Sequence, residues 1–436
     1  MNSQLPTPNF EPLKIAMIGC GGYANYLSCR IAEVPEFCTL VAVSTHDFQS
    51  PAADAMRTKG VTVFAGVDEM LDSLSPETCD AVIVPTSIES HFDYTRRIVE
   101  RGFHVLLEKP PVAAIQDLDQ LIELQRRSGK WIAVNFQYLY TDMTQNLKWR
   151  LMSGEFGAVK SVKARALWRR PESYFLRNFW SGKLKINGRW VLDGVIGNPL
   201  AHLLAEALYL AAPDAGMLTP ETVEAELYHA NETEGDDTSC VRISGANEVA
   251  VYFYGSLCGA EQSQVFCEIE TDRAQIQFTE FSEVEIHFHD GKTESGRTPE
   301  YEETQPRRRM LAAIAARLLN DEKPLITVEE CRPYMLAWNG AFESFGFPAA
   351  LPESAFVRQE LEEYGTTRVL PEIKALMTAA SENGQLFSEN GAAWARPGRK
   401  ISLDDYSFFP SENPALMEKN PQVRNKAGRG AAALQV

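Results

Sequence analysis

A chain of 436 residues is long enough to form two domains that each bury a hydrophobic core of their own. Hydrophobic residues make up 44% of the chain and charged residues 23%, which is the composition of an ordinary soluble protein. The formal net charge of -17 repels nucleic acid and anionic membranes, so we expect neither as a partner. This charge does not exclude a small ligand, because a ligand site can be locally positive.

No apolar run approaches the roughly 20 residues that a membrane-spanning helix needs, and residues 1–12 do not resemble a signal peptide. We therefore expect a cytoplasmic protein. The eight cysteines are scattered and form no C-x-x-C pair. Because several of them lie in apolar runs, we expect reduced, buried thiols and no metal site.

The first predicted element is a strand at Leu13–Ile18, which leads into a glycine-rich turn and then into a helix over residues 24–34. The turn has the G-x-G-x-x-A form of the dinucleotide-binding fingerprint: Gly19, Cys20, Gly21, Gly22, Tyr23 and Ala24. Here Gly19 permits the tight turn, Gly21 lets a pyrophosphate approach the backbone, and Ala24 lets the helix pack on the strand. Such a turn needs glycine even without a ligand, but its place at the start of a long α/β pattern favours a nucleotide site.

The second strand, Thr39–Ser44, ends at Ser44, Thr45 and His46, where NAD-preferring sites carry an acidic residue for the ribose 2′-hydroxyl. Hydroxyl groups and an imidazole at this position tolerate a 2′-phosphate, whereas Asp47 comes late along the chain for a ribose ligand. The alternative is an ordinary loop whose polar residues cap the next helix. We expect NADP or NAD to bind, with a modest preference for NADP.

Strands and helices alternate up to residue 137, which predicts an N-terminal Rossmann domain, a doubly wound parallel sheet with ligands at the carboxyl ends of its strands. We predict further strands at residues 61–64, 81–84, 104–107 and 131–136, and helices at residues 67–74, up to residue 101, and at 115–128. The polar residues at the ends of these strands complete the expected cofactor-binding set: Pro85, Thr86, His91, Glu108, Lys109 and Asn135.

From residue 138 to residue 345 the pattern becomes that of an α+β domain with an open, mostly antiparallel sheet. We predict helices at residues 142–153 and 198–212, a strand at 159–168, and later strands at 222–229, 240–243, 248–255, 264–271, 274–278 and 283–289. The helices within residues 305–345 are expected to pack back on the first domain. Because the face or the edge of an open sheet is a usual place for subunit contacts, we expect a homodimer or homotetramer through it.

Residues 346–436 are predicted to form an extended C-terminal segment with a disordered end, because the last fifty or so residues contain Pro-Gly and Asn-Pro breaks and a basic, Gly- and Ala-rich end. Within this segment we expect Tyr406–Phe409 to dock on the rest of the protein. No internal repeat is visible in the chain.

Lys109 is the strongest candidate for a catalytic residue. It follows an apolar strand and precedes two prolines, so its backbone is rigidly placed at the carboxyl edge of the sheet. Beside a nicotinamide, its amine can exchange a proton with a carbonyl or hydroxyl oxygen as hydride moves, and Glu108 can orient it. We expect burial to lower its pKa toward neutrality. The alternative is a surface Glu-Lys pair, which is the commonest fate of this dipeptide.

Three further polar residues are candidates for the same reaction. His202 lies four residues beyond Asn198 on one predicted helix, so the two side chains are expected to project from one face. The apolar stripe beside His202 fits a satisfied core histidine equally well. Asp193, at the end of an apolar pair, either faces the same cleft or caps a turn.

Four motifs follow one another along the chain: the turn at residues 19–24, the loop at residues 85–91, the triplet Glu108-Lys109-Pro110, and the Ser-Gly-Glu-Phe-Gly turn at residues 153–157. Together they resemble the glucose–fructose oxidoreductase/inositol dehydrogenase (Gfo/Idh/MocA) family over about residues 13–345. The resemblance implies a Rossmann domain, a second domain with an open antiparallel sheet, NAD or NADP, and reversible oxidation of a sugar or cyclitol carbinol in the cleft between the domains. The family's catalytic lysine corresponds to Lys109.

The family also has an Asp-x-x-x-His pair, which Asn198 and His202 match with asparagine in place of aspartate. Thr45 at the ribose position is a second departure, and Leu139, where many members have an arginine near the cofactor, is a third. The segment from residue 174 to residue 193 resembles one branch of the family. An aromatic face and several donors in this segment suit a polyhydroxylated ring, and the expected substrate-binding residues are Tyr174, Arg177, Asn178, Trp180 and Lys183.

Two other classes of function stay open at this point. One is a non-catalytic regulator that senses a dinucleotide or a sugar and binds a protein partner. The other is a glycosidase that uses bound NAD to oxidise its substrate transiently and later reduces it again. Lys109 and His202 argue against the regulator, whereas Asn198 is compatible with it.

Overall fold

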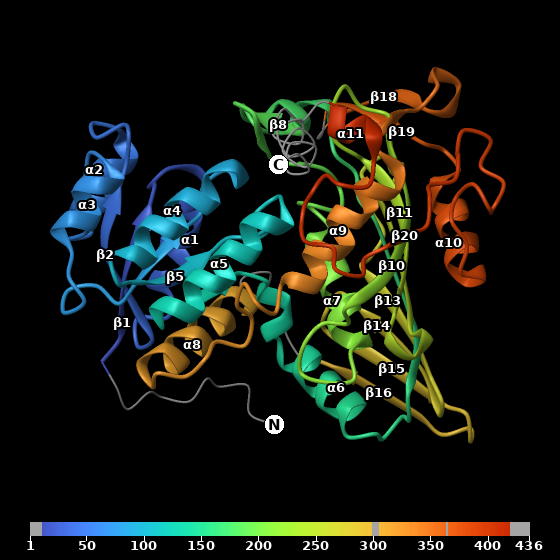
Figure 1. The fold of residues 1–436 in the computed structure, drawn as a ribbon, viewed down its shortest axis with the longest axis horizontal. Coiled ribbons are helices and arrows are strands. Elements are labelled where there is room, and N and C mark those ends of the chain that lie inside the picture. The colour runs from blue at the N-terminus through green and yellow to red at the C-terminus, as the bar shows by residue number, and fades with distance from the viewer. Residues whose placement is uncertain (1–10, 299–304, 363–364, 419–436) are drawn as a thin grey trace, which may run out of the picture. The chain divides into compact units, whose positions relative to one another are not determined.

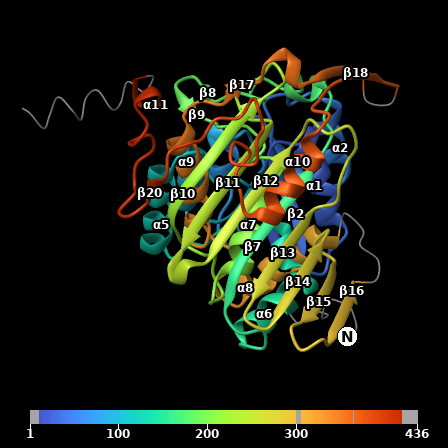
Figure 2. The same ribbon diagram turned by 90° about the vertical axis from the view of Figure 1, so that its right-hand side faces the viewer.

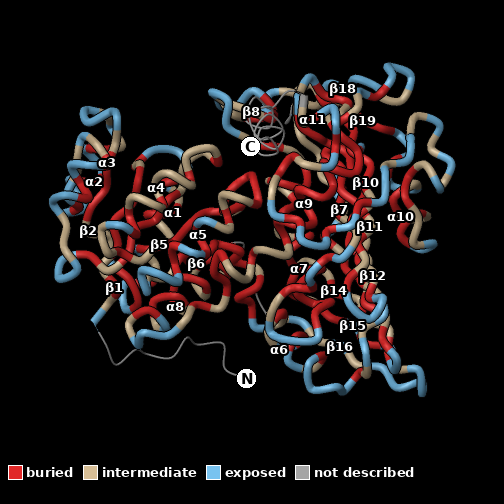
Figure 3. Tube along the Cα trace, viewed as in Figure 1, coloured by how far each residue is buried: buried red, intermediate tan, exposed pale blue. Residues whose placement is uncertain are grey.

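A computed structural model describes residues 11–298, 305–362 and 365–418 of the chain. The described chain forms two compact units (Figure 1). Among the described residues, the first comprises 11–112, 117–147, 297–298 and 305–332, and the second comprises 113–116, 148–296, 333–362 and 365–418. Each unit therefore contains segments from distant parts of the sequence. Figure 3 shows that the buried residues concentrate on the strands and the helices packed against them in each unit.

The first unit contains a six-stranded sheet in which every strand is parallel to its neighbours, in the order β3-β2-β1-β4-β5-β6. The strands are β1 (Leu13–Ile18), β2 (Cys38–Ser44), β3 (Thr62–Phe64), β4 (Ala81–Val84), β5 (His104–Leu107) and β6 (Ile132–Val134). This order reverses direction beside β1, so that the carboxyl ends of β1 and β4 flank a crevice where doubly wound sheets bind ligands. The predicted parallel sheet of the Rossmann fold is confirmed.

Helices α1–α5 and α8 pack around this sheet (Figure 1). Their bounds are α1 (Gly22–Ala32), α2 (Pro51–Thr58), α3 (Val67–Ser73), α4 (Ile88–Glu100), α5 (Ile115–Ser128) and α8 (Gln305–Leu319), and the short helix η1 spans Gln137–Tyr140. Helix α2 is not among the helices that the sequence pattern predicts. Its start is encoded by Ser50, whose hydroxyl accepts a hydrogen bond from the Ala53 N–H, and by Pro51 in the first turn.

The second unit is built on a ten-stranded, mostly antiparallel sheet in the order β16-β15-β14-β13-β7-β12-β11-β10-β17, with β20 beside β10. The strands are β7 (Val159–Leu167), β10 (Pro220–His229), β11 (Thr238–Gly245), β12 (Ala250–Ser256), β13 (Phe266–Thr271), β14 (Ala274–Thr279), β15 (Glu283–Phe288), β16 (Thr293–Arg297), β17 (Ala349–Ala350) and β20 (Ile401–Ser402). Two small hairpins, β8–β9 (Lys185–Ile186 and Arg189–Trp190) and β18–β19 (Val357–Leu361 and Gly365–Val369), accompany it. The open, mostly antiparallel sheet that the sequence predicts is confirmed.

Helices lie on both faces of this second sheet, as the turned view in Figure 2 shows for α10. The helices of the unit are α6 (Asp142–Met152, shared with the first unit), α7 (Ala201–Ala211), α9 (Arg332–Phe345), α10 (Ile373–Asn383), α11 (Pro414–Glu418) and the short helices η2 (Glu172–Leu176), η3 (Ala246–Glu248) and η4 (Glu353–Ala355). Alternate residues of β12 face opposite sides: Gly255 lies against Leu200 just before α7, whereas the Tyr254 hydroxyl donates to the Ala380 carbonyl of α10 at 3.0 Å.

One expectation for the C-terminal half, an extended segment after residue 345, is corrected by the structure. Helix α8 belongs to the first unit, but α9 belongs to the second, where every residue from Tyr334 to Phe345 is buried. The segment after residue 345 is not merely extended, because it forms the β18–β19 hairpin and α10. The expected docking of residues 406–409 is confirmed, since Phe409 is buried and the Tyr406 hydroxyl donates to the Glu343 carboxylate at 2.8 Å. The end that was expected to be disordered falls, in residues 419–436, outside the described residues.

All eight cysteines are free thiols, and seven of them are buried, with Cys29 half-buried. Among the described residues, no helix has the length and apolar character that crossing a membrane would require.

Candidate active site

The glycine turn at residues 19–24 has the backbone that the motif predicts. Gly19 adopts a φ of +94°, which side-chain-bearing residues rarely take, and it joins β1 to α1. Buried Ala24 packs against it, as expected. A Cβ atom added at Gly21 or Gly22 would meet no atom within 4 Å, so the outer side of the turn is open. With no acidic residue in the first turn of α1, the helix N-terminus suits an anionic pyrophosphate.

The end of β2 offers hydroxyl groups and no carboxylate. Ser44 is buried, and its hydroxyl has no hydrogen-bond partner among the residues that the structure describes. The Thr45 hydroxyl accepts a hydrogen bond from the Asp47 N–H at 3.2 Å, which is the turn that the alternative interpretation of this loop predicts. His46 and Asp47 are exposed. Arg57 is held by Asp54 and by the Phe48 carbonyl, at 2.6 Å each.

Glu108 gathers side chains from three other segments of the first unit. Its Oε1 atom accepts hydrogen bonds from the Tyr23 hydroxyl at 3.1 Å, Asn135 Nδ2 at 3.0 Å and Arg307 Nη1 at 3.3 Å. Glu108 and Arg307 are both buried, and the Arg307 guanidinium lies over the Tyr23 ring at 5.2 Å. These contacts tie the glycine turn, the end of β5 and the end of β6 together at the carboxyl edge of the sheet.

The amide of Asn135 is only half used within this cluster. Its Nδ2 atom donates to Glu108, but its buried Oδ1 atom has no hydrogen-bond partner among the described residues. An unsatisfied buried acceptor is costly, which suits a site that a polar ligand group completes. Together with the open glycine turn, this acceptor makes the residues of the first unit fit a dinucleotide.

His91 joins two of the loops that the sequence analysis placed at this edge. It is buried, with Nδ1 at 3.0 Å from the Pro110 carbonyl and Nε2 at 3.0 Å from the Thr86 carbonyl. Burial lowers the pKa of His91, and the neutral ring can donate to only one of these oxygens. The contacts of His91 therefore fit a residue that holds the loop at Pro85 and Thr86 beside the turn that follows Lys109.

Lys109 lies where the sequence predicts it, at the carboxyl end of β5, and is half-buried. It stands between Glu108, which is fixed by the contacts above, and Pro110, which is joined to it by a cis peptide bond and is buried. Its backbone is therefore set by rigid neighbours on both sides.

In the second unit, Asp193 and Asn198 are in direct contact. The Asn198 Nδ2 atom donates to Asp193 Oδ1 at 2.8 Å, and the Gly182 N–H donates to Asp193 Oδ2 at 2.6 Å. From the sequence, Asp193 was expected either to face a cleft or to cap a turn. Its hydrogen bond with Asn198 is a contact that the sequence does not predict. Asp193 is buried and serves as the anchor of the turn that leads to α7.

The predicted placement of Asn198 on a helix face is wrong. Helix α7 begins at Ala201, and Asn198 lies in the turns that precede it. Pro199 explains the difference, because the residue before a proline is disfavoured in helical geometry. Asn198 and His202 therefore do not form an i, i+4 pair on one helix.

His202 differs from all its neighbours on α7. Every other residue of this helix is buried, whereas His202 is half-buried. The far end of the helix is fixed by buried Lys148, whose Nζ atom donates to the carbonyls of Tyr209 and Ala212 at 2.5 and 2.7 Å. Burial lowers the pKa of Lys148 to about 7. Helix α7 thus presents a single imidazole from an otherwise buried, anchored element.

The expected substrate-binding residues gather on η2 and the turn after it. The Arg177 guanidinium stacks over the Tyr174 ring at 3.9 Å and the Trp180 ring at 5.3 Å. Asn178 is used locally, since its Oδ1 atom accepts from the Trp180 N–H at 3.1 Å and from Ser181. Lys183 forms an ion pair of 3.0 Å with Glu234. These residues make a cation–aromatic stack with a fixed turn beside it.

Two buried residues, Arg307 and Asp236, are not among the site residues that the sequence predicts. Arg307 stands in the first turn of α8, where a cation opposes the helix dipole, and this unfavourable position is the signal that marks it. Asp236 is buried beside the turn before α7, where its Oδ2 atom accepts from the Ser239 hydroxyl at 2.7 Å and the Ile196 N–H at 3.4 Å. Its signal is a pair of acidic residues directly before an apolar strand.

Known proteins resemble this chain in sequence and in fold. Residues 13–136 match the GFO_IDH_MocA family, described as an oxidoreductase family with an NAD-binding Rossmann fold. D-glucoside 3-dehydrogenase of Escherichia coli is 26% identical over 230 residues, 53% of this chain and 61% of that protein, so the match spans about three fifths of the relative. D-xylose 1-dehydrogenase (NADP(+)) 2 of Haloferax volcanii is 25% identical over 71% of this chain and 93% of its own.

Solved structures share the fold at lower identity. A levoglucosan dehydrogenase in complex with NADH and levoglucosan superposes with a TM-score of 0.65 at 15% identity, over 76% of this chain and 96% of that one. An inositol dehydrogenase homologue from Azotobacter vinelandii, in complex with NAD+, gives a TM-score of 0.66 at 14% identity, over 77% and 97%.

The parallel sheet, its glycine turn and the second sheet define a two-unit protein whose first unit is an NAD(P)-binding Rossmann fold. Residues 13–136, which form the parallel sheet of this unit, match the Gfo/Idh/MocA oxidoreductase family, and the relatives and solved structures above are similar to the chain beyond that region.

Proposed function

We propose that this protein is an NAD(P)-dependent oxidoreductase that transfers a hydride between the nicotinamide and a carbinol or carbonyl carbon of a sugar, a sugar derivative or a cyclitol. The observation that carries the proposal is Lys109, held at the carboxyl end of β5 next to Glu108 in the NAD(P)-binding unit. The named activities of the relatives on glucosides and xylose support a sugar as the substrate.

The cofactor would be held by residues of the first unit. The backbone of the open turn at Gly21 and Gly22 would receive the pyrophosphate, and Ser44 and Thr45 the ribose of the adenosine half. Thr86, Glu108, Lys109 and Asn135 would surround the nicotinamide half, with the vacant Asn135 acceptor available to an amide N–H. When bound, the nicotinamide supplies the acceptor or donor of the hydride.

In the oxidation direction, the substrate hydroxyl loses its proton to Lys109 or His202, while the hydride leaves the carbon and a carbonyl forms. The Tyr174, Arg177 and Trp180 stack would bind the substrate by its apolar ring face. The Asp193–Asn198 pair would hold the start of α7 and thereby position His202.

The simplest test is a fluorescence titration of the purified protein with NADH and with NADPH. Saturable binding of at least one is expected, and binding of neither would contradict the proposal. For the chemical step, Lys109→Arg should lose most of the turnover while it still binds cofactor, because arginine keeps the charge but does not give up its proton. Turnover of Lys109→Arg at the wild-type rate would exclude an acid–base role for Lys109.

For the cofactor, we propose that both NADP and NAD bind, with a preference for NADP of about 1 kcal/mol, or about fivefold in affinity. Thr45 and buried Ser44 offer hydroxyl groups and no repelling carboxylate. The preference stays small because Arg57 is engaged by Asp54 and Phe48 and gives no bidentate phosphate contact. Thr45→Asp should reverse the preference. If the wild-type protein binds NAD about a hundredfold more tightly than NADP, the ribose ligand is Asp47 rather than Thr45.

We also propose a homodimer or homotetramer that assembles through the second sheet. The contact would use β13–β16, because the face formed by β7, β11 and β12 carries the chain's own residues 373–396. The outward residues of β13 and β14 are polar, and they include Glu268, Glu270, Gln275 and Gln277. Such a contact would therefore be made by hydrogen bonds rather than by apolar packing. Light scattering coupled to gel filtration tests this, and a monomer at all concentrations would contradict it.

A further inference from the structure

Three donors converge on one oxygen atom of Glu108 in the first unit. The Oε1 atom accepts hydrogen bonds from the Tyr23 hydroxyl at 3.1 Å, Asn135 Nδ2 at 3.0 Å and Arg307 Nη1 at 3.3 Å. An ionised carboxylate only accepts hydrogen bonds, so it decides which end of a neighbouring amide faces it. The Asn135 amide therefore stands with its nitrogen toward Glu108 and its oxygen away from it.

Arg307 keeps Glu108 in this accepting form. The guanidinium is buried, with 10% of the side chain exposed, and it lies over the rings of Tyr23 and Tyr26 at 5.2 and 5.5 Å. A guanidinium stays protonated in proteins and only donates hydrogen bonds. Without this charge, Glu108 could take up a proton and donate it to the Asn135 oxygen, and the amide could then stand either way. The ion pair thus removes the reversed orientation.

The segment after β6 carries two buried acceptors that the protein leaves unused. Neither Asn135 Oδ1 nor Gln137 Oε1 has a hydrogen-bond partner among the residues that the structure describes, and both residues are buried. A buried carbonyl oxygen without a donor costs free energy, which a donor on a ligand recovers. Asn135 is the better defined of the two, because its orientation is fixed through Glu108.

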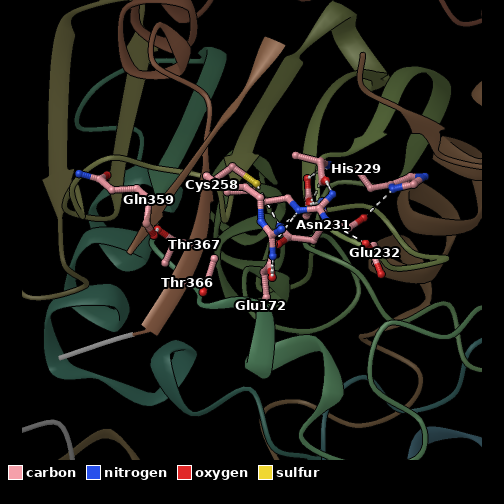
Figure 4. Close-up of polar contacts among 12 residues, drawn as sticks. Glu172, His229, Asn231, Glu232, Cys258, Gln359, Thr366 and Thr367 are labelled. Carbon is pink, nitrogen blue, oxygen red and sulfur yellow. Dashed lines mark hydrogen bonds and ion pairs between the residues drawn. The ribbon is translucent and has the colours of Figure 1, made fainter. Parts of the chain in front are cut away.

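An unused oxygen does not by itself mark a ligand site, as Asn231 of the second unit shows. Its Nδ2 atom donates to Asp237 Oδ2 at 2.8 Å, and its own Oδ1 atom is likewise without a partner in the part of the chain that the structure describes. Figure 4 shows the turn around Asn231, where Arg368 donates to the Ala230 carbonyl at 2.6 Å and to Glu232 at 3.0 Å. The two asparagines thus share a hydrogen-bonding pattern, and their positions in the fold distinguish them.

Asn135 lies at the ligand edge of the parallel sheet. It directly follows β6, and Glu108 ties it to Tyr23 of the open glycine turn. With the pyrophosphate at this turn and the adenosine ribose at the end of β2, the other half of a dinucleotide would extend over the ends of β4, β5 and β6. Its pyridine ring carries a carboxamide, whose nitrogen bears two N–H donors. This group supplies the donor that the Asn135 oxygen lacks.

We propose that Arg307 and Glu108 are positioning residues that hold the Asn135 amide in one orientation, so that its oxygen accepts a hydrogen bond from the nicotinamide carboxamide and selects for a dinucleotide that carries this group. The proposal rests on the proposed NAD(P)-dependent function and adds to it the origin of a selectivity for the ring substituent. A carboxamide would be bound more tightly than a methyl ketone of nearly the same shape, which has the carbonyl but no N–H.

The test is calorimetric titration of the full-length protein with NAD and with 3-acetylpyridine adenine dinucleotide, in which a methyl ketone replaces the carboxamide. If NADP binds more tightly than NAD, the corresponding pair of 2′-phosphates is used. The carboxamide form should bind at least about tenfold more tightly, because the buried acceptor loses its donor in the methyl ketone. Equal affinities would overturn this proposal and leave the proposed function standing, whereas binding of neither dinucleotide would overturn both.

The accepting oxygen is then removed at Asn135. Asn135→Leu keeps the approximate size of the side chain but has no acceptor, so the ratio of the two dissociation constants should fall to about one. Asn231→Leu is the matched control, because it also removes an amide that donates to a buried carboxylate, and it should leave the ratio at the wild-type value. A ratio that Asn135→Leu does not lower, or that Asn231→Leu lowers equally, would refute the contact. Asn135→Ala takes the place of Asn135→Leu if the latter does not fold.

Arg307→Met tests the positioning role. Without the guanidinium the amide can reverse, so the ratio should fall several-fold, while Arg307→Lys, which keeps a cation, should retain part of it. A merely structural role would weaken both dinucleotides alike and leave the ratio unchanged, and that result would refute the assignment of Arg307. If Arg307→Met does not fold, the double variant Glu108→Gln with Arg307→Met replaces it. The double variant has no unpaired charge, and either end of the amide at position 135 can face the glutamine.

Discussion

Asn198 donates a hydrogen bond of 2.8 Å to the buried carboxylate of Asp193, five residues earlier in the turn that leads to α7. An amide at Asn198 is therefore the matching partner of a negative charge that is already present. The carboxylate of this pair comes from Asp193, and position 198 supplies the amide. This pairing predicts how substitutions at Asp193 and Asn198 change the stability of the protein.

Asn198→Asp should destabilise the protein at neutral pH and lower its activity. The substitution puts two carboxylates at hydrogen-bond distance, and two such charges cannot both ionise without strong repulsion, so the pKa of one must rise. We expect a loss of about 1–3 kcal/mol in the free energy of unfolding at pH 8, and less at pH 5 where one proton is shared. Urea unfolding of the variant and the wild type at pH 8 and pH 5 measures this loss of free energy.

The exchanged pair is the control. In Asp193→Asn with Asn198→Asp, the new amide at position 193 can accept the Gly182 N–H and donate to the new carboxylate, so stability should return. If Asn198→Asp is as stable as the wild type, or if the double variant is no more stable than Asn198→Asp, the hydrogen bond between positions 193 and 198 does not contribute as proposed.

Gly21→Ala should leave the fold intact and weaken cofactor binding. Gly21 has a φ of -98°, which alanine adopts without strain, and a Cβ atom there meets no protein atom within 4 Å. The methyl group would instead occupy the side from which a pyrophosphate approaches the backbone. We expect about a tenfold or larger rise in the Kd for NADH or NADPH with an unchanged melting temperature.

Adenosine serves as the control ligand for Gly21→Ala because it lacks the pyrophosphate. Its affinity should change little, while the affinity of the dinucleotide falls. Equal dinucleotide affinity in the two proteins would mean that the phosphates do not cross this turn.

Glu108→Gln should destabilise the first unit although it preserves the shape of the side chain. The charge of Glu108 compensates Arg307, and both side chains are about nine-tenths or more buried, at 6% and 10% exposure. Removal of one partner of a buried ion pair leaves an uncompensated charge and costs roughly 3–5 kcal/mol. Because glutamine still accepts a hydrogen bond, we expect about 3 kcal/mol, measured by urea unfolding.

Adding Arg307→Met to Glu108→Gln should recover part of that loss, since the unpaired charge is then gone. Strictly additive effects of the two substitutions would show that Glu108 and Arg307 do not stabilise one another. Cofactor titration of the same variants reports whether the cluster also shapes the nicotinamide side of the site.

The sequence predicts the first sheet well because its strands are buried on both faces. β4 is an unbroken apolar run and β5 is apolar after His104, and the structure gives both strands the predicted bounds. α5 likewise spans Ile115–Ser128 as its periodicity predicts. α2 was missed because it is short and has only two buried residues, Ala53 and Met56, which is too few to produce a visible apolar period.

The candidate site is less accessible to sequence reasoning because its contacts are long-range. Glu108 could be chosen from its place after β5, but its partner Arg307 lies 199 residues away and belongs to another helix. No local pattern encodes that pairing. The apolar stripe that begins at Leu200 predicts a helix that starts at Asn198, whereas Pro199 and the Asp193 carboxylate favour a turn there. Such competition between local signals is decided only by the packed structure.

Asp236 should make stability fall as the pH rises from about 4 to about 6. Burial raises the pKa of Asp236 from 3.8 to about 6. Between these values the folded protein holds a proton that the unfolded chain has already released, so folding is favoured at the acidic end and the advantage is lost by pH 6. Two pKa units correspond to about 3 kcal/mol for this fully buried group.

Asp236→Asn should remove this pH dependence, because the amide is neutral throughout. Both donors, the Ser239 hydroxyl and the Ile196 N–H, go to the same oxygen, Oδ2, so one amide oxygen can replace it. Urea unfolding at pH 4.5 and pH 7.5 gives the difference in the free energy of unfolding between the variant and the wild type. The contributions of all other titrating groups cancel in this difference. The variant should gain stability relative to the wild type at the higher pH only. A difference that is the same at both values would mean that Asp236 keeps an ordinary pKa, and that the turn before α7 is held by its hydrogen bonds with no cost from a buried charge.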